Sequence, residues 1–365
     1  MLSLYRKWMK FVSEVVKPIT PPAFATENKV VLETKSYRLR QFSEKGDRNP
    51  VLILPPQAGH HSSICDFSPG NSLVKTFLLH GITSVYAIEW KSAAHDRAPE
   101  TLEDLMVYTD QCVSFIGGRT NLVGLCQGGW QSAMYTALNQ RKVNSLVLAG
   151  SPIDAHAGGG KIKDAVNVLP LLFFKGLVGM GGGIYRGEIQ LLAFKLMNPY
   201  DRFFLDYCKL YFNIDDAEFL ERHHAFRNWY EYVNHLPGRW YLQVVDQLFI
   251  NNNLIKGKIN LFGEAVDLKN IDCPLFMIAG SKDDITPPRQ VFSAAKYVST
   301  PPDRIAGYLA DSGHIGLFMG GDSLKTVWPK VIEGMKTYSR IEEENMAIGM
   351  KTYSRIEEEN MAIAV

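Results

Sequence analysis

Short apolar runs, each bounded by turn residues, recur along the N-terminal part of the chain and predict buried strands. They lie at 50–55, 84–90, 121–125 and 145–149. Runs this short and this apolar are typical of strands that are covered on both faces. Segments with helical spacing separate them, at 73–79, at 101–115 and from 127 onward. Because strand and helix alternate, the sequence predicts a doubly wound, mostly parallel α/β sheet, with one or two antiparallel strands at 30–42 leading into it.

The alternation stops after residue 154 and predicts an insertion. Residues 155–254 are rich in glycine, aromatic and long helical side chains, and the strand pattern resumes at 274–279 and 305–309. We therefore expect an N-terminal segment, one α/β core in two pieces, a helical cap and a tail: 1–45, 46–154 with 255–334, 155–254, and 335–365. The tail repeats residues 335–348 letter for letter at 350–363. Two short repeats cannot build a solenoid, so no function is assigned to them.

Targeting signals and overall charge restrict the class of protein. Residues 1–17 have amphipathic spacing but no continuous apolar core of a signal peptide. The apolar stretch 166–180 contains Pro170 and Lys175 and is too short to cross a bilayer. The chain carries 39 basic and 38 acidic side chains, a formal charge of +1, which leaves little field to attract nucleic acid. The sequence predicts a cytoplasmic protein that binds no nucleic acid.

The five cysteines are Cys65, Cys112, Cys126, Cys208 and Cys273. Their number is odd, and no two of them form a C-x-x-C pair, which argues against a disulfide framework and a structural zinc site. No set of His, Asp and Glu has metal-ligand spacing either, so we expect no metal and no cofactor. Four of these thiols are expected to be structural, and Cys126 is the exception.

Cys126 lies in the motif Gly124-Leu-Cys-Gln-Gly-Gly129, directly between a predicted strand and a predicted helix. This is the G-x-S-x-G nucleophile elbow of the α/β-hydrolase fold with cysteine in place of serine. The turn lifts the side chain above the sheet, and the helix N-terminus favours a thiolate and a developing oxyanion. The motif predicts a cysteine nucleophile; a buried cysteine in an ordinary glycine-rich turn is the alternative.

The same fold expects an acid and then a histidine further along the chain. Asp283 follows a late strand in a G-x-x-D-x-x-x-P pattern, and Asp284 is its immediate competitor. His314 comes 31 residues later, between two glycines. We expect His314 to act as base towards Cys126 and Asp283 to orient its ring. Asp154, which follows another strand, stays open as an alternative acid.

The oxyanion would be bound by the backbone N–H of Gln127 and by an amide from the loop containing Gln57 and Ala58, because that loop follows the first core strand. His60 and His61 belong to the same loop, where they would line the oxyanion site or bind substrate. His223 and His224 are expected on the solvated face of a cap helix.

These residues resemble the polyhydroxyalkanoate (PHA) synthases, whose lipase-like box is G-x-C-x-G-G. The likeness covers most of residues 50–320 and includes 55–74, Ile88-Glu-Trp90, Cys273-Pro274 and 313–316. The chain is most similar to the short catalytic subunits of this family. The resemblance implies an acyltransferase of PHA biosynthesis in which Cys126 is acylated by (R)-3-hydroxyacyl-CoA and CoA is released. It also makes His314 the base and gives Asp283 a role in activating the hydroxyl group that extends the polymer.

The resemblance further implies several partners, namely the growing polyester chain or the surface of a polyester granule, a second synthase subunit, and further copies of the chain. An intracellular PHA depolymerase or thioesterase would use the same three residues with water as acceptor. A silent granule-associated protein is the third possibility. The apolar run 169–174 fits either a lid or granule contact or a buried helix.

Overall fold

The computed structural model describes residues 2–43 and 49–339. Most of the duplicated tail therefore lies outside the described residues. The core is one eight-stranded sheet with the strand order β1-β2-β6-β3-β7-β8-β13-β14. Its strands are β1 (Lys29–Glu33), β2 (Tyr37–Gln41), β3 (Val51–Leu54), β6 (Val85–Trp90), β7 (Thr120–Leu125), β8 (Val143–Ala149), β13 (Leu275–Gly280) and β14 (Ile305–Ala310).

The six strands from β6 to β14 in this order run parallel, whereas β1 and β2 are antiparallel additions at one edge. The expected doubly wound, mostly parallel sheet is therefore confirmed, and so are the antiparallel strands at 30–42. Because the strands are parallel, the loops after β3, β7, β13 and β14 all leave from one edge of the sheet, where binding sites of such folds are built.

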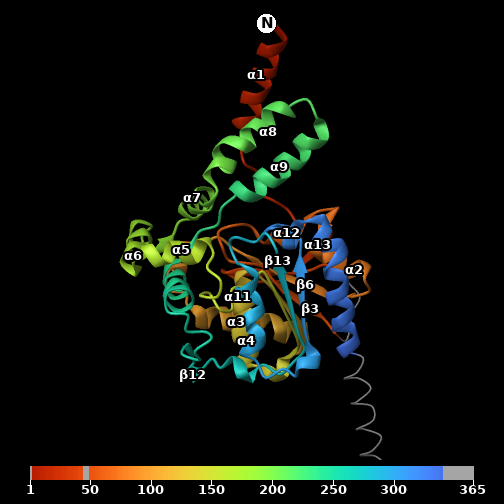
Figure 1. The fold of residues 1–365 in the computed structure, drawn as a ribbon, viewed down its shortest axis with the longest axis vertical. Coiled ribbons are helices and arrows are strands. Elements are labelled where there is room, and N and C mark those ends of the chain that lie inside the picture. The colour runs from red at the N-terminus through yellow and green to blue at the C-terminus, as the bar shows by residue number, and fades with distance from the viewer. Residues whose placement is uncertain (1, 44–48, 340–365) are drawn as a thin grey trace, which may run out of the picture.

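Helices cover both faces of the sheet (Figure 1). Apolar side chains alternate along each strand and join two separate buried clusters, one under α3 and α4 and one under α2, α12 and α13. The helices of the α/β core are α2 (Leu73–Leu79), α3 (Leu102–Ile116), α4 (Gln127–Leu138), α11 (Pro288–Phe292), α12 (Gly316–Met319) and α13 (Gly321–Thr326). Residues 328–339 form a further helix. Thr101 and Asp104 form a capping box at the start of α3, as their spacing predicts.

Helices fill the long connection between β8 and β13. They are α5 (Lys161–Val168), α6 (Leu171–Met180), α7 (Gly187–Met197), the π-helix η4 (Asp201–Leu205), α8 (Asp206–Phe212), α9 (Ala217–Glu231), α10 (Gly238–Gln243) and a second π-helix, η5 (Val244–Ile250). Short two- and three-residue strands complete the structure: β4 (Asp66–Ser68), β5 (Asn71–Ser72), β9 (Ile184–Tyr185), β10 (Leu236–Pro237), β11 (Asn260–Leu261) and β12 (Glu264–Ala265).

The N-terminal helix α1 (Leu2–Val15) projects from the molecule together with α8 and α9 (Figure 1). We call these three helices the arm. The ring of Phe11 packs edge-on against Tyr211, with centroids 5.6 Å apart. His224 Nε2 lies 2.5 Å from Glu14 Oε2, and Arg227 donates to the carbonyl oxygens at the end of α1. The expectation that His224 lies on a solvated face is therefore wrong, because α1 covers it.

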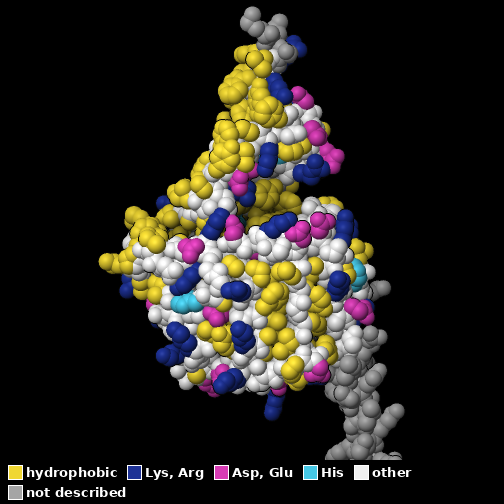
Figure 2. All heavy atoms as spheres, viewed as in Figure 1, with side chains coloured by type: hydrophobic (Ala, Val, Ile, Leu, Met, Phe, Trp, Pro, Cys, Tyr) yellow, Lys and Arg dark blue, Asp and Glu magenta, His cyan; other side chains and the backbone are white. Residues whose placement is uncertain are grey.

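The apolar run in α6 is not a buried helix. Phe174 is buried, but Leu172 is 76% exposed and Phe173 is 44% exposed. Further exposed apolar side chains follow on α7, η4, α8 and α1, and Figure 2 shows apolar side chains over the arm. Within residues 2–43 and 49–339, no helix has the length and apolarity that crossing a membrane requires.

Candidate active site

Cys126 occupies the turn between β7 and α4. Its φ of 52° and ψ of −114° lie outside the regions that non-glycine residues ordinarily adopt. The turn is held in place, because the Cys126 N–H donates to the Ala149 carbonyl at 2.8 Å and its own carbonyl accepts from Gly129 N–H at 3.0 Å. Strain of this kind costs about 1–3 kcal/mol and persists where the surrounding structure enforces it. Such a turn lifts the cysteine side chain off the sheet.

Two glycines of the motif are required by close packing. A Cβ atom on Gly124 would lie 2.4 Å from Gly129 Cα, and one on Gly128 would lie 1.8 Å from the Leu54 carbonyl oxygen. Neither position has room for a side chain, because in each case the obstacle is backbone. The glycines thus let α4 begin directly against β3 and β7.

His314 and Asp283 meet at the carboxyl edge of the sheet. His314 Nδ1 lies 2.7 Å from Asp283 Oδ2, and both side chains are almost completely buried. The other carboxylate oxygen of Asp283 accepts from the N–H groups of Ile285 (3.0 Å) and Thr286 (2.8 Å). Because both oxygens are engaged, the carboxylate is fixed in one orientation and fixes the imidazole in turn.

The His314 ring also interacts with Cys126. Burial by itself lowers the pKa of His314, but the negative charges of the Cys126 thiolate and the Asp283 carboxylate, together with hydrogen bonds to both, raise it to about 10. The ring contacts Phe318 edge-on at 5.4 Å, and its Cε1 lies 3.2 Å from where a Cβ on Gly150 would be. The site therefore favours the charged form of the His314 imidazole.

The two alternative acids lie elsewhere. Asp284 is half-exposed and pairs with Lys161 at 2.6 Å. Asp154 accepts hydrogen bonds from Asn252 Nδ2 at 2.8 Å and Tyr297 OH at 3.0 Å, which fixes a loop and leaves its carboxylate engaged. The structure thus brings Asp283 to His314 and does not bring Asp284 or Asp154 there.

The expected oxyanion residues lie next to the elbow. Gln127 is the first residue of α4, while Gln57 and Ala58 are buried in the loop after β3. Leu54 pairs with Gly124 across the β3–β7 ladder, so this loop and the elbow leave the sheet side by side. Neither amide atom of Gln57 has a hydrogen-bond partner among the described residues, and the same is true of Gln127 Oε1. A bound ligand can satisfy these buried atoms, which would otherwise be costly.

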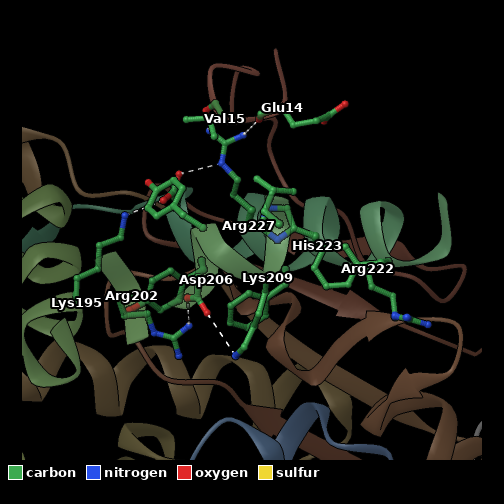
Figure 3. A pocket seen from close by; sticks show the side chains of 15 residues that line it. Glu14, Val15, Lys195, Arg202, Asp206, Lys209, Arg222, His223 and Arg227 are labelled. Carbon is green, nitrogen blue, oxygen red and sulfur yellow. Dashed lines mark hydrogen bonds and ion pairs between the residues drawn. The ribbon is translucent and has the colours of Figure 1, made fainter. Parts of the chain in front are cut away.

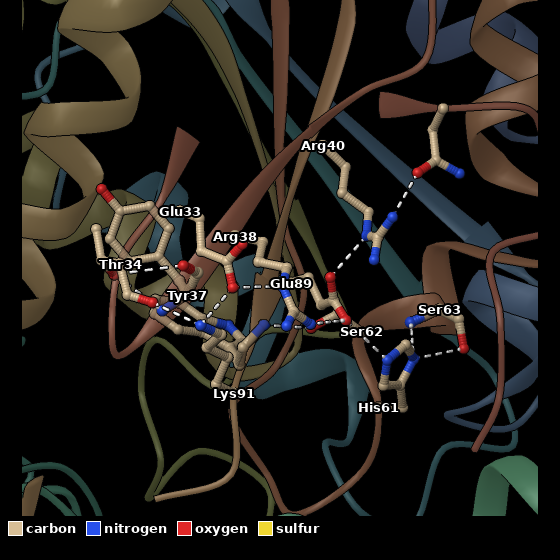
Figure 4. Close-up of polar contacts among 12 residues, drawn as sticks. Glu33, Thr34, Tyr37, Arg38, Arg40, His61, Ser62, Ser63, Glu89 and Lys91 are labelled. Atoms are coloured by element: carbon tan, nitrogen blue, oxygen red, sulfur yellow. Dashed lines mark hydrogen bonds and ion pairs between the residues drawn. The ribbon is translucent and has the colours of Figure 1, made fainter. Parts of the chain in front are cut away.

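His61 holds this loop in place through a network of hydrogen bonds that was not predicted from the sequence (Figure 4). Its Nδ1 accepts from Ser63 N–H at 3.2 Å, so its Nε2 carries the proton and donates to Glu89 Oε1 at 3.3 Å. Glu89 Oε2 accepts from Arg40 Nε at 2.6 Å. Burial opposes the charge of Glu89, but hydrogen bonds from His61 and Arg40 and the Arg40 charge lower its pKa to about 2. The one signal in the sequence is an acidic residue in an otherwise apolar strand.

His60 is enclosed by rings instead of facing polar groups. Its imidazole lies 4.9 Å from Trp229, 5.1 Å from Tyr230 and 5.4 Å from Phe194, measured between centroids. Burial lowers its pKa to about 4, so the ring is neutral at physiological pH. His60 thereby connects the loop after β3 to α9.

Three of the other four thiols differ from Cys126 in being buried, whereas Cys208 on α8 is half-buried. Cys65, Cys112 and Cys273 are buried, and burial raises the pKa of Cys65 and brings that of Cys112 to about 12. Thiols with raised pKa values are poor nucleophiles. Across the described part of the chain, no group of three His, Cys, Asp or Glu side chains is arranged to hold a metal ion.

Comparison with known proteins identifies relatives of this chain. The chain is 28% identical over 320 residues to the poly(3-hydroxyalkanoate) polymerase subunit PhaC of Haloferax mediterranei, a match that covers 84% of this chain but 63% of that protein. It is also 28% identical to PhaC of Allochromatium vinosum, covering 85% and 86% of the two chains. The resemblance to PHA synthases is thus confirmed at the level of homology.

The fold and the family follow from two further matches. The crystal structure of a monoacylglycerol lipase from Paleococcus ferrophilus superposes with a TM-score of 0.51 at 15% identity, covering 82% of this chain and all of that one. The expected α/β-hydrolase fold is confirmed. The family model described as "Protein of unknown function (DUF3141)" matches residues 37–326. The chain is therefore a distant homologue of the PhaC subunits and belongs to the DUF3141 family.

Proposed function

We propose that the protein is a PHA synthase-like acyltransferase that takes the acyl group of an (R)-3-hydroxyacyl-CoA onto Cys126. The observation that carries the proposal is the strained cysteine elbow beside the buried His314–Asp283 pair. The homology to PhaC subunits supports this choice over other reactions of the fold. Cysteine suits the substrate, since a thiolate exchanges readily with a thioester.

In the acylation step, His314 takes the proton of the Cys126 thiol, and the thiolate attacks the thioester carbonyl carbon. The Gln127 N–H and an amide of the loop at Gln57 and Ala58 stabilise the oxyanion of the tetrahedral intermediate. When the bond to the CoA sulfur breaks, the His314 imidazolium protonates that sulfur. The products are an acyl thioester on Cys126 and free CoA.

In the transfer step, the hydroxyl group of a second hydroxyacyl unit or of the growing chain gives its proton to His314 and attacks the Cys126 thioester. An ester forms, and the cysteine leaves as a thiolate that recovers the proton. Asp283 holds the ring in the required tautomer throughout. Its two oxygens are already bonded, which favours orientation of His314 over direct contact with the acceptor hydroxyl.

Whether the acyl group is polymerised or hydrolysed depends on the access of water to the acyl-cysteine. A synthase must keep water from the acyl-cysteine, and the proposal gives this role to the helices between β8 and β13. The exposed apolar side chains Leu172 and Phe173 would suit contact with a polyester chain or granule surface in the cytoplasm. A second synthase subunit and further copies of the chain belong to the same proposal.

The test is incubation of the purified protein with (R)-3-hydroxybutyryl-CoA. CoA release with insoluble polymer, and an acyl mass on intact protein that disappears in Cys126→Ala, is the expected result. CoA release with only free 3-hydroxybutyrate would identify a depolymerase or thioesterase instead. Absence of any acyl mass at Cys126 would identify a catalytically silent member of the family.

A further inference from the structure

The arm contains a pocket that the proposed chemistry does not use. It has a volume of about 280 Å³ and lies between the end of α1, η4 with α8, and α9 (Figure 3). Most of its wall is apolar, with charged side chains extending around it. Figure 2 shows a recess between the arm and the body of the molecule, lined by apolar side chains and edged by charged ones.

The charge of this pocket is predominantly positive. Five basic side chains line it, Lys195, Arg202, Lys209, Arg222 and Arg227, against three acidic ones. Lys195 and Arg227 are committed to Glu231, at 2.7 and 3.3 Å.

Two of the five cations, Lys209 and Arg222, are much more exposed than the other three. Lys209 lies 3.9 Å from Asp206, and its side chain is 63% exposed. Arg222 pairs with the exposed Glu218 one turn earlier on α9, which is not part of the pocket wall. Burial, His224 and Arg227 together lower the pKa of the neighbouring His223, against weaker effects of Asp206 and Glu14. Lys209 and Arg222 each have one acidic partner but are largely exposed, so an anion in the pocket can reach both charges.

Aromatic rings form part of the same wall. Phe219, Phe226 and Tyr230 line the pocket from one face of α9, and Tyr207 lines it from α8. Phe226 and Tyr230 are stacked at 5.6 Å with an interplanar angle of 12°. Arginine also belongs to this surface, since the Arg202 guanidinium lies 5.1 Å from the centroid of Tyr230. Planar aromatic and guanidinium surfaces of this kind bind nucleobases by stacking.

The pocket is connected directly to the loop that follows β3. Tyr230, from the pocket wall, stacks on His60 at 5.1 Å. Its neighbour Trp229 donates from Nε1 to the His61 carbonyl oxygen at 3.0 Å. His60 follows Gln57 and Ala58 by two to three residues. A ligand in the pocket thus lies one aromatic contact away from the loop beside Cys126.

We propose that this pocket binds the phosphorylated nucleotide end of the acyl-CoA substrate. The inference rests on the proposed function, because it assigns a place to the part of the substrate that does not react. CoA combines a planar base with several phosphate charges, which match the rings and the cations of the wall. The formal charge of the whole chain is only +1, so the attraction for such an anion must be local. In this arrangement Lys209 and Arg222 contact phosphate oxygens.

The test compares a substrate that carries the nucleotide with one that lacks both the nucleotide and the pantothenate part of CoA. Single-turnover acylation of Cys126 is followed by intact mass with (R)-3-hydroxybutyryl-CoA and with the N-acetylcysteamine thioester of the same acid. The double variant Lys209→Ala/Arg222→Ala should lower the ratio of the two second-order rate constants, CoA over N-acetylcysteamine, about tenfold. The matched control is Arg6→Ala, an exposed cation of the arm outside the pocket wall, which should leave the ratio within twofold.

Several results would overturn the proposal. One is that the double variant leaves both rate constants unchanged; another is an equal fold loss for both thioesters, which would mean that the variant disturbs the arm and not a nucleotide site. If neither thioester acylates the parent protein, the proposed function fails. Calorimetric titration with CoA itself then tests whether the pocket binds the nucleotide. CoA binding that weakens about tenfold in the double variant supports the proposed nucleotide site. No binding of CoA, or equal binding by the parent and the double variant, contradicts it.

Discussion

His314 Nδ1 and Asp283 Oδ2 lie 2.7 Å apart in a buried pair that the surrounding backbone fixes in place. The acid is immobile because Ile285 and Thr286 donate their N–H groups to its second oxygen. In the proposed mechanism this arrangement leaves the histidine, and not the carboxylate, to exchange protons with Cys126 and a substrate. The pH dependence of the reaction should therefore report on His314.

The pH profile of the acylation rate should have an alkaline limb, in which the rate falls as pH rises through about 10. The thiolate of Cys126 and the carboxylate of Asp283 raise the pKa of His314 to about 10. The imidazolium that protonates the departing CoA sulfur is therefore present below that pH and lost above it. The measurement is the single-turnover acylation rate between pH 6 and 11, with protein integrity followed by circular dichroism. A rate that rises steadily past pH 10 would contradict the role of His314 as acid.

Removing the charge of Asp283 should shift the alkaline limb of the acylation rate to lower pH. In Asp283→Asn the carboxylate no longer stabilises the imidazolium, so the pKa of His314 falls, and the ring can adopt the wrong tautomer. We expect the acylation rate at pH 7.5 to drop about 10²- to 10⁴-fold and the alkaline limb to shift towards neutral pH. Asp284→Asn is the matched control, since Asp284 pairs with Lys161 at a half-exposed position. Equal losses in both variants would argue against the assignment of Asp283.

Replacement of Gly128, at the start of α4, by alanine should disturb the turn that holds Cys126. Gly128→Ala would place Cβ 1.8 Å from the Leu54 carbonyl oxygen, so α4 must shift away from β3. We expect the free energy of unfolding in urea to fall by about 1–3 kcal/mol, with a larger relative loss of acylation because Cys126 and Gln127 move with the helix. Gly70→Ala, where a Cβ meets nothing within 4 Å, should alter neither quantity.

The core of this protein and the arrangement of its candidate site were predictable where they depend on local pattern. The strand expected at 84–90 is observed as Val85–Trp90, and the helix expected at 101–115 as Leu102–Ile116. The relation between His314 and Asp283 also followed from chain order, because the fold fixes which strands carry them.

Contacts that depend on three-dimensional pairing were not predictable in this way. His61 meets Glu89 only because the loop after β3 folds back over β6, and Arg40 reaches Glu89 from β2 across the antiparallel ladder. The amphipathic pattern of α1 likewise indicates an apolar face but does not name its partner. That partner is on α8 and α9, some 200 residues away in the chain.

The Glu89 network provides a prediction about stability that is independent of the catalytic proposal. Hydrogen bonds and charge from His61 and Arg40 outweigh burial and lower the pKa of Glu89 from 4.5 to about 2. A carboxylate with a lowered pKa in the folded protein stabilises it above the unfolded pKa, and this contribution is lost as pH falls through the folded pKa. Glu89→Gln should therefore lower the free energy of unfolding by about 3 kcal/mol at pH 6. The difference from the parent should shrink between pH 4.5 and pH 2.

The measurement is urea unfolding of the parent and of Glu89→Gln at pH 6, 4 and 3. Glu33→Gln serves as the matched control: Glu33 also accepts from Arg38, at 2.9 Å, but its side chain is about half exposed, so the pair is screened by water and should contribute little. Because Glu89 holds His61, and His61 belongs to the loop of Gln57 and Ala58, Glu89→Gln should also slow acylation of Cys126 at pH 7.5. A stability difference that stays constant down to pH 3 would mean that the charge of Glu89 is not what holds the loop.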